Sequence, residues 1–375
     1  MKYLISGGGT GGHIFPAVSI ANALREADPT CEILFVGAIG RMEMERVPQA
    51  GYDIVGLPVK GFDRSRPWRN IRVVIDLLRS MCQARRIIRD FRPDVGVGVG
   101  GYASGAAMKM AAKMGVPILL QEQNGFAGVT NKLLKDDASK ICVAYEGMER
   151  FFPKEKIILT GNPVRQNLTT GTMTEAIEYF NQQFGMHFTA DNKTLLIIGG
   201  SLGARTINNS IVAHLPELLR SNIQVVWQTG KNYFQECKTA LAEQMKALGM
   251  TNSHICCTDF ISQIPLAYAL ADLVISRAGA SSISELCLLG KPTILVPSPN
   301  VAEDHQTHNA LALVRKDAAV LVKDIDAKDL LISTALSIIN NQQQLSSLHQ
   351  HILTLALPDS ANLIAKEVMA LAKAK

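Results

Sequence analysis

Short apolar runs alternate with helix-like stretches from the start of the chain, and each run leads into a turn that contains glycine. In the first half these runs are residues 3–6, 33–37, 95–99 and 118–121. Apolar runs of strand length between helical stretches are typical of a parallel sheet whose strands are joined by crossover helices. The first half therefore predicts one Rossmann-like unit.

The same rhythm restarts after residue 190 and predicts a second Rossmann-like unit. Its expected strands are residues 195–198, 225–228, 255–258, 273–276 and 293–296. The break should fall near residues 161–165, because Asn162-Pro163 is a turn signal and residues 166–192 are polar. The expected fold class is α/β, with two Rossmann-like domains whose parallel sheets face a cleft.

The pattern divides the chain into residues 1–163 and residues 164–358. A length of 375 residues also favours two domains, because one domain typically has about 100 to 200 residues. The last stretch carries Ile364, Val368 and Leu371 at helical spacing. A helix over about residues 359–375 should therefore pack back on the first domain.

Composition excludes several classes of protein. With 47% apolar and 19% charged residues, the chain is globular rather than disordered. Its seven cysteines show neither disulfide nor metal-ligand spacing, which suits a reducing cytoplasm. The glycines from Gly7 onward leave no room for a signal-peptide core, and no apolar stretch approaches the roughly 20 residues of a membrane-spanning helix. Any membrane would be contacted from its surface.

Residues 7–12 read Gly-Gly-Gly-Thr-Gly-Gly between an expected strand and an expected helix, and they satisfy G-x-G-x-x-G. Glycine lets the backbone approach a diphosphate, and helix N-terminal amides favour anions. A dinucleotide site would also place an acid about 20 positions later, but Gly37-Ala38-Ile39 stand there. That gap disfavours a dinucleotide, and the absence of G-x-x-x-x-G-K-[ST] excludes a Walker loop.

His13 directly follows this loop. A neutral imidazole there could take a proton from an attacking hydroxyl at physiological pH. The alternative is a histidine that braces the loop with a hydrogen bond. The sequence leaves both interpretations open.

Two further segments of the second unit carry candidate chemistry. Residues 199–204 form another glycine turn, in which the Ser201 hydroxyl suits a phosphate oxygen; tight helix packing would explain only the glycines. Residues 277–285 lead into an expected helix that carries Glu285, whose carboxylate can accept two hydrogen bonds from a ribose diol. The alternative for Glu285 is a capping box with Ser282.

Polar clusters follow other expected strands, at the edge where open α/β sheets bind ligands. In residues 121–125, Asn124 could bind sugar hydroxyls, although an Asn-Gly turn is the plain alternative. His305 and His308 lack a third ligand, which argues against zinc.

No metal site and no tightly bound cofactor are expected. The D-x-D sequence Asp324-Ile325-Asp326 is placed in a surface connection and interpreted as chance. Backbone amides, helix dipoles and Arg165 would then stabilise the leaving diphosphate.

Arginines are concentrated between Arg64 and Arg92. Arg72, Arg79 and Arg86 recur every seven residues and share one helix face. An apolar stripe lies beside them, formed by Val74, Leu77, Leu78 and Met81.

This basic segment has two interpretations. A surface helix would press Trp68 and Leu78 among lipid headgroups while Arg72, Arg79 and Arg86 meet anionic lipid. An ordinary crossover helix would instead bury its stripe and solvate its arginines. Nucleic acid is not expected as a partner, because no nucleic-acid fold or interleaved aromatic pattern accompanies the charge.

Taken together, the motifs resemble the MurG family, bacterial glycosyltransferases that add N-acetylglucosamine to a lipid-linked muramyl peptide. The resemblance spans nearly the whole chain. The matching sequences are Gly-Gly-Thr-Gly-Gly-His at 8–13, Gly-Gly-Tyr at 100–102, Gln-Glu-Gln-Asn-Gly at 121–125, Gly-Asn-Pro-Val-Arg at 161–165, Gly-Gly-Ser-Leu-Gly-Ala at 199–204, residues 279–285, and Asp-His-Gln at 304–306 before Asn309.

The resemblance implies a GT-B fold with an acceptor-binding, membrane-facing N-terminal domain and a UDP-sugar-binding C-terminal domain. It implies UDP-N-acetylglucosamine (UDP-GlcNAc) as donor, undecaprenyl-diphosphate N-acetylmuramyl pentapeptide (lipid I) as acceptor and lipid II as product. The expected location is cytoplasmic, peripheral on the inner face of the plasma membrane. Expected partners are an anionic membrane surface and other cell-wall synthesis proteins.

Site residues are carried over by the same resemblance. Glu285 would hold the ribose hydroxyls, Ile261 the uracil, and Gln306 with Asn124 the sugar. The acceptor would contact Gly8, Gly9, Gly100, Gly101, Tyr102 and Glu122. The donor would contact Thr10, Gly11, Gly12, Asn124, Arg165, Ser201, Ile261, Ala280, Ser281, Ser282, Ile283, Ser284, Glu285 and Gln306.

The sequence departs mildly from the family pattern. Gln121 stands where the family often has histidine, and Ala38 where threonine is common. Residues 278–282 read Ala-Gly-Ala-Ser-Ser, where the family often has Ser-Gly-Ala-Leu-Thr. These changes affect only the hydrogen bonding around the donor.

The expected reaction is an inverting single displacement, in which the muramyl C4 hydroxyl attacks the anomeric carbon and His13 is the candidate general base. The inversion comes from the family. The rival enzyme class is a UDP-GlcNAc 2-epimerase, which shares the fold and donor but needs no lipid acceptor. A sugar-nucleotide sensor without turnover is the non-enzymatic alternative.

Overall fold

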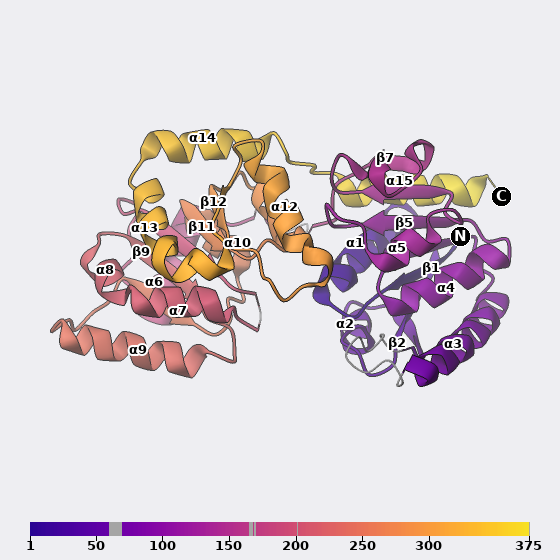
Figure 1. The fold of residues 1–375 in the computed structure, drawn as a ribbon, viewed down its shortest axis with the longest axis horizontal. Helices are drawn as coiled ribbons and strands as arrows, with labels where there is room; N and C mark the ends of the chain where they lie inside the picture. The colour runs from indigo at the N-terminus through magenta and orange to yellow at the C-terminus, as the bar shows by residue number, and fades with distance from the viewer. Residues whose placement is uncertain (60–69, 165–167, 169, 201, 375) are drawn as a thin grey trace. The chain divides into compact units, whose positions relative to one another are not determined.

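The computed structural model describes residues 1–59, 70–164, 168, 170–200 and 202–374, without the side chains of residues 70–74 and 302. The chain divides into two compact units (Figure 1). Unit 1 comprises Met1–Val164 and Leu357–Lys375, and unit 2 comprises Arg165–Ala356.

Unit 1 is built on a seven-stranded sheet in the order β3-β2-β1-β4-β5-β6-β7, and every pair of neighbouring strands is parallel. Parallel neighbours require crossover connections, which the helices between the strands supply. The strands are β1 (Lys2–Gly7), β2 (Glu32–Ala38), β3 (Asp53–Leu57), β4 (Val95–Gly100), β5 (Ile118–Glu122), β6 (Lys140–Val143) and β7 (Ile157–Leu159).

Helices cover both faces of this sheet, because successive side chains of a strand point to opposite faces. Tyr3 and Ile5 pack in one core with α1 and α15, and Leu4 packs in the other core with α3, α4 and α5. The helices of unit 1 are α1 (Gly11–Ala27), α2 (Glu43–Gln49), α3 (Asn70–Phe91), α4 (Tyr102–Lys113), α5 (Val129–Leu134) and α15 (Ser360–Lys373).

The last helix, α15, belongs to unit 1 although it follows the whole of unit 2 in sequence. Its Ile364, Ala365 and Val368 are buried in the core that contains α1. The side chain of Lys140 in β6 also bonds to Glu367 at 2.9 Å. The C-terminal segment therefore completes the core of the first unit.

Unit 2 has a six-stranded parallel sheet in the order β10-β9-β8-β11-β12-β13. Its strands are β8 (Thr194–Ile198), β9 (Gln224–Gln228), β10 (Ile255–Thr258), β11 (Leu273–Ser276), β12 (Thr293–Leu295) and β13 (Val320–Leu321). Its helices are α6 (Met173–Phe184), α7 (Arg205–Ala213), α8 (Leu215–Arg220), α9 (Phe234–Ala247), α10 (Ile264–Leu270), α11 (Ala280–Leu288), α12 (His305–Val314), α13 (Ala327–Ile339) and α14 (Gln342–Leu353).

The prediction of two parallel-sheet α/β units is confirmed, while a cleft between the sheets stays a prediction. The sequence did not indicate β3, β6, β7 and β13 as strands, because these are short or lie toward the sheet edges and carry weaker apolar runs. The polar stretch 166–192 contains the helix α6. A capping box between Thr172 and Glu175 stabilises its N-terminus. Within the described ranges, no helix is long and apolar enough to cross a membrane.

Candidate functional site

Each sheet has one point where the strand order reverses, between β1 and β4 in unit 1 and between β8 and β11 in unit 2. In open α/β sheets, ligands bind at the carboxyl ends of the strands at such a point. Residues 8–10 follow β1 and Gly101 follows β4, while residues 199, 200 and 202–204 follow β8 and residues 277–279 follow β11. Each predicted glycine segment therefore lies at the ligand-binding edge of its own sheet.

His13 lies in the first turn of α1. Its Nδ1 is 3.0 Å from the Gly8 carbonyl oxygen, and Thr10 Oγ1 is 3.4 Å from the same nitrogen. A carbonyl oxygen only accepts hydrogen bonds, so Nδ1 carries a proton, and in the neutral ring Nε2 carries the lone pair. The bracing bond is therefore present, and it sets the tautomer that a base acting through Nε2 needs. The base role itself stays a prediction.

The backbone at the end of β4 approaches the glycine loop so closely that only glycine fits. At Gly100, with φ of +103°, an added Cβ would lie 2.9 Å from the His13 ring. At Gly101, with φ of +92°, it would lie 2.5 Å from the Gly8 carbonyl oxygen. Tyr102 then begins α4 with 55% of its surface exposed. This pair of glycines shapes the surroundings of His13, and their contacts with the acceptor stay predictions.

Glu122 ends β5 and is buried. One carboxylate oxygen accepts from the Asn124 backbone N–H at 3.1 Å, and the other accepts from the Gly128 N–H and the Asn131 side chain, each at 2.9 Å. These bonds order the turn that carries Asn124. Glu122 therefore shapes the segment that carries Asn124, and the contact of Asn124 with the sugar stays a prediction.

A buried amide network ties this turn to the end of β4. Gln121 donates to the Asn162 side chain at 3.0 Å, and Asn162 donates to the Gln123 carbonyl at 3.0 Å. Gln123 donates to the Val99 carbonyl at 2.7 Å. Gln121 therefore takes part in bonds among protein groups that keep the edge of the sheet in place.

In unit 2, Gln228 at the end of β9 links two predicted donor segments. Its amide nitrogen donates to the Gly200 carbonyl at 3.1 Å, and its amide oxygen accepts from the Ile261 N–H at 2.9 Å. Ile261 is buried among protein groups, and its contact with the uracil stays a prediction. The sequence analysis missed Gln228, although its place at the carboxyl end of a strand was an available signal.

The start of α11 suits an anion. The helix begins at Ala280 after Gly279, and no side chain caps it. The first N–H groups of a helix have no partner inside the helix and favour anionic groups. The Ser281 hydroxyl in the same turn is buried and has no hydrogen-bond partner among the described residues. These groups fit oxygens of a diphosphate.

Glu285 lies one turn further along α11 and is buried. Its Oε2 accepts from the Tyr268 hydroxyl of α10 at 3.1 Å. The capping-box alternative for Ser282 and Glu285 is wrong, because the helix N-cap is Gly279 and makes no side-chain hydrogen bond. The Glu285 carboxylate is instead oriented by a neighbouring helix, and Tyr268 is a second residue that the sequence analysis missed.

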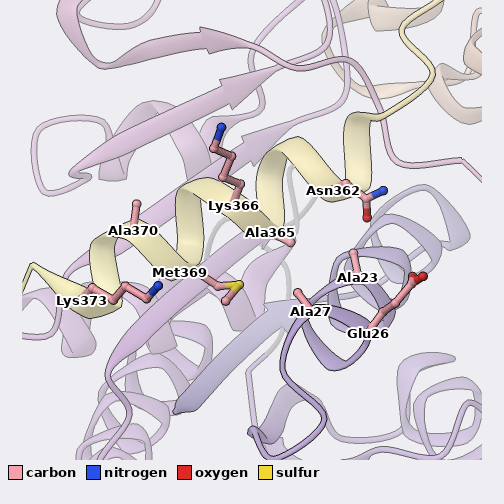
Figure 2. Close-up of a pocket in the computed structure, with 9 residues that line it drawn as sticks. All are labelled: Ala23, Glu26, Ala27, Asn362, Ala365, Lys366, Met369, Ala370 and Lys373. Atoms are coloured by element: carbon pink, nitrogen blue, oxygen red, sulfur yellow. The ribbon is translucent and has the colours of Figure 1, made fainter.

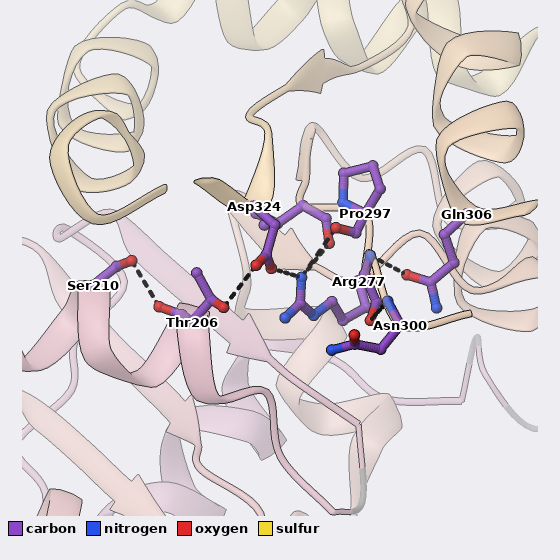
Figure 3. Close-up of polar contacts among 9 residues, drawn as sticks. Thr206, Ser210, Arg277, Pro297, Asn300, Gln306 and Asp324 are labelled. Atoms are coloured by element: carbon purple, nitrogen blue, oxygen red, sulfur yellow. Dashed lines mark hydrogen bonds and ion pairs between the residues drawn. The ribbon is translucent and has the colours of Figure 1, made fainter. Parts of the chain in front are cut away.

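Arg277 follows β11 and holds the segment before α12 (Figure 3). Its Nη1 donates to the Val296 and Pro297 carbonyls at 3.0 and 3.2 Å and forms an ion pair with Asp324. The other Asp324 oxygen accepts from Thr206 Oγ1 of α7 at 2.8 Å. The Asp324 carboxylate therefore joins three segments, and the interpretation of the D-x-D sequence as a chance match to a metal motif stays a prediction.

Gln306 lies at the start of α12, and its Oε1 accepts from the Ser298 N–H at 2.8 Å (Figure 3). With that oxygen engaged, the side-chain NH2 is the group that can donate to a sugar oxygen. Asn309 of the same helix donates to the Ala278 carbonyl at 3.2 Å and so ties α12 to the segment before α11.

The outer face of α3 combines apolar and basic side chains. Ser80, Ala84 and Ile88 are buried, and Leu77 and Met81 pack on the same side. Leu78, a member of the apolar stripe and a predicted lipid contact, is 59% exposed. The exposed side chains of this face are Ile75, Leu78, Arg79, Cys82, Arg85, Arg86, Arg89 and Asp90, of which Arg89 pairs with Asp90 at 3.1 Å. The inner face therefore packs as a crossover helix would, while contact of the outer face with lipid stays a prediction.

Several predicted residues lie outside the described residues. These are Trp68, Arg165 and Ser201, and nothing is described of the Arg72 side chain. Among the residues that are described, no group of three His, Cys, Asp or Glu side chains could hold a metal ion.

A groove of about 540 Å³ lies between α1 and α15 (Figure 2). It is lined by Ala23 and Ala27 of α1 and by Ala365 and Met369 of α15, with Lys366 at its edge. Ala23 is ten residues beyond His13 in one helix, a separation of about 15 Å at 1.5 Å per residue. The groove is therefore distinct from the glycine-loop site.

Two family models match the chain. These are the Glycosyltransferase family 28 N-terminal domain over residues 3–143 and the Glycosyltransferase family 28 C-terminal domain over residues 194–364. A protein of Bacteroides fragilis named UDP-N-acetylglucosamine–N-acetylmuramyl-(pentapeptide) pyrophosphoryl-undecaprenol N-acetylglucosamine transferase is 60% identical over 374 residues, which cover 100% of this chain and 96% of the relative. The chain belongs to this transferase family, the MurG family.

Solved structures support the fold of this MurG family member. MurG of Acinetobacter baumannii matches with a TM-score of 0.79 at 24% identity, covering 98% of this chain and 99% of that chain. The UDP-GlcNAc 2-epimerase of Neisseria meningitidis bound to UDP-GlcNAc matches with a TM-score of 0.68 at 14% identity, covering 99% and 100%. Because both enzyme classes share the GT-B fold, membership of the MurG family rather than the fold separates them.

Proposed function

We propose that this protein transfers N-acetylglucosamine from UDP-GlcNAc to lipid I and so forms lipid II. The observation that carries the proposal is 60% identity, across the whole chain, with a transferase whose name states that reaction. Two loops at the switch points of two parallel sheets agree with an enzyme that binds two diphosphate-bearing substrates.

His13 is the proposed general base. The muramyl C4 hydroxyl gives its proton to His13 Nε2, and its oxygen forms a bond to the anomeric carbon. The bond from that carbon to the UDP oxygen breaks on the opposite face, so the configuration inverts and UDP leaves with the electron pair. The hydrogen bond from Nδ1 to the Gly8 carbonyl supports this role, because it keeps the Nε2 lone pair as the proton acceptor.

Unit 2 is the proposed donor-binding unit. The uncapped start of α11 and the Ser281 hydroxyl would receive the diphosphate, and Glu285 the ribose hydroxyls. Ile261 would contact the uracil, and the Gln306 amide would donate to the sugar. All of these groups are supplied by the carboxyl edge of one sheet and the helices that follow it.

Unit 1 is proposed to contact the inner face of the plasma membrane from the cytoplasm. The outer face of α3 exposes Ile75 and Leu78 at 46% and 59%. Arg79, Arg85 and Arg86 are exposed on the same face. Apolar side chains among arginines suit a surface of anionic lipid, and an acceptor with an undecaprenyl chain has to be met at such a surface.

The experiment that tests the function is incubation with labelled UDP-GlcNAc, with and without lipid I, followed by separation of lipid and aqueous products. We expect label in the lipid fraction only when lipid I is present. Conversion of the donor sugar without acceptor would instead indicate the epimerase reaction. Donor binding without turnover in either condition would indicate a sugar-nucleotide sensor.

A further inference from the structure

A buried glutamate lies beneath the glycine loop of unit 1. Glu43 is the first residue of α2 and has no exposed surface. Its Oε2 accepts from the Gly9 backbone N–H at 2.9 Å, and its Oε1 accepts from the Ala38 backbone N–H at 3.0 Å. Burying a carboxylate is costly unless both oxygens are bonded, and here both are.

The peptide group between Gly8 and Gly9 is bonded on both sides. Its N–H donates to Glu43, and its carbonyl oxygen accepts from Nδ1 of His13 at 3.0 Å. Carboxylate, peptide and imidazole therefore form one continuous chain of hydrogen bonds. Hydrogen bonds in such a chain polarise one another. The bond that the Gly9 N–H donates to the Glu43 carboxylate therefore makes the Gly8 carbonyl a stronger acceptor.

The glycines around Glu43 are explained by its side chain. A Cβ on Gly8 would lie 2.2 Å from Glu43 Oε1, and one on Gly37 would lie 2.6 Å from Glu43 Cγ. The space that these two glycines leave open is occupied by the glutamate. The first glycine loop is therefore shaped in part to receive a carboxylate of the protein itself.

We propose that Glu43 is a positioning residue for His13 and acts through the Gly8–Gly9 peptide. It holds the carbonyl that selects the Nδ1–H tautomer, and it stabilises the positive charge on the imidazole after Nε2 has taken the proton of the attacking hydroxyl. Glu43 keeps its own charge throughout and exchanges no proton. The logic is that of a Ser-His-Asp triad, except that a peptide group stands between carboxylate and imidazole.

This inference rests on the proposed function. Glu43 also has a structural role, because it accepts a hydrogen bond from the Ala38 backbone N–H. The two parts can be separated. Glu43→Gln keeps the side-chain shape but removes the charge and leaves one backbone N–H without its acceptor. Glu45→Gln is the matched control, because Glu45 lies on the same helix with an exposed side chain.

The first measurement is a double-mutant cycle on kcat for transfer to lipid I. Glu43→Gln should lower kcat roughly 10- to 100-fold, as is typical of residues that orient a reactive group. In a His13→Ala background the same change should alter kcat less than about twofold, because the residue through which Glu43 acts is gone. Glu45→Gln should leave kcat unchanged.

The second measurement is the ring tautomer of His13 by ¹⁵N NMR, which needs no turnover. We expect the Nδ1–H tautomer in the wild type and a shift toward Nε2–H in Glu43→Gln. The proposal would be overturned by an Nε2–H tautomer in the wild type or by an unchanged tautomer in Glu43→Gln. It would also be overturned if Glu43→Gln lowered kcat equally with and without His13. If Glu43→Gln does not fold, the wild-type tautomer still decides. A wild-type protein that transfers no sugar would refute the proposed function. The NMR result would still test whether Glu43 acts on His13 through the Gly8–Gly9 peptide.

Discussion

The Tyr268 hydroxyl donates to the Glu285 carboxylate at 3.1 Å, from one buried helix of unit 2 to the next. Glu285 thus has a protein donor that fixes the direction of its oxygens before any nucleotide binds. A carboxylate held in this way loses less conformational freedom when it receives two ribose hydroxyls.

Replacing Tyr268 with phenylalanine should weaken donor binding without changing the chemical step. A hydrogen bond to a charged group contributes about 1.5 kcal/mol, so KM for UDP-GlcNAc should rise about tenfold while kcat stays nearly constant. Steady-state kinetics at saturating acceptor measure both. Tyr179→Phe is the control, because its exposed hydroxyl lies 3.2 Å from the Ser262 hydroxyl and not at the Glu285 carboxylate. A fall in kcat with constant KM would contradict the proposed role of Glu285.

Gly101→Ala should abolish most of the activity. The new Cβ would lie 2.5 Å from the Gly8 carbonyl oxygen, the atom to which His13 donates. A displacement of about 1 Å near the reacting atoms can lower the rate about 10²-fold. We expect that loss in kcat, with UDP binding to unit 2 unchanged in calorimetry.

The matched control is Gly115→Ala, in the same unit. Gly115 also has positive φ, at +77°, but an added Cβ there meets nothing within 4 Å. It should therefore lower stability slightly and leave kcat near the wild-type value. Equal loss of activity in both variants would mean that backbone strain, not the contact with Gly8, is responsible.

Asn208→Ala should destabilise unit 2. The Asn208 side chain accepts from Trp227 Nε1 at 3.0 Å and donates to the Thr229 carbonyl at 2.8 Å, all in the core. Leaving these two groups without partners should lower the free energy of unfolding by about 2–4 kcal/mol. Urea unfolding followed by the fluorescence of Trp227, in a Trp68→Phe background, measures this directly.

Asn209→Ala tests the same helix from its solvent side, since Asn209 is the exposed neighbour. Its midpoint in urea should match that of the parent protein. A similar fall in both variants would point to a general effect on α7 rather than loss of the buried hydrogen bonds, because alanine favours a helix more than asparagine does.

Cys82 should be the first cysteine to react with iodoacetamide in the folded protein. It is exposed on α3, whereas burial raises the pKa of the Cys142, Cys237, Cys256 and Cys287 thiols to about 12. At pH 8, a thiol with that pKa is ionised in about one molecule in 10⁴, and the thiolate is the reactive form. Peptide mass spectrometry after short labelling gives the order of reaction. Equally fast labelling of Cys256 would show that unit 2 opens on the labelling timescale.

Reversing charge at Arg79 and Arg86 together should reduce binding to vesicles that contain anionic lipid. Both side chains are exposed on the face of α3 that also carries Leu78. Each basic residue near such a surface contributes about 1 kcal/mol, so the two reversals should lower the partition coefficient at least tenfold. Sedimentation with vesicles measures it, and Arg220→Glu on unit 2 is the control. Unchanged binding would favour a helix whose arginines are merely solvated.

Much of the fold followed from local pattern. The expected strands of both units recur in the sheets, because buried parallel strands are short apolar runs bounded by glycine turns. The loops after β1 and β8 were likewise placed at the correct edges. The strands β6 (Lys140–Val143) and β7 (Ile157–Leu159) were not predicted. Segments of four and three residues are too short to show the periodicity that identifies a strand.

What the sequence by itself determined is the order of the elements, the motifs of the MurG family and the candidate base His13, since each depends on neighbouring residues. Only the tertiary structure paired Glu43 with Gly9, 34 residues away, Gln228 with Ile261, 33 residues away, and Arg277 with Asp324, 47 residues away. The physical reason is the parallel sheet, which gathers the carboxyl ends of strands that are distant in sequence at one edge. Polar side chains that look isolated in the sequence become hydrogen-bond partners there, and those bonds orient the residues that the motifs identify.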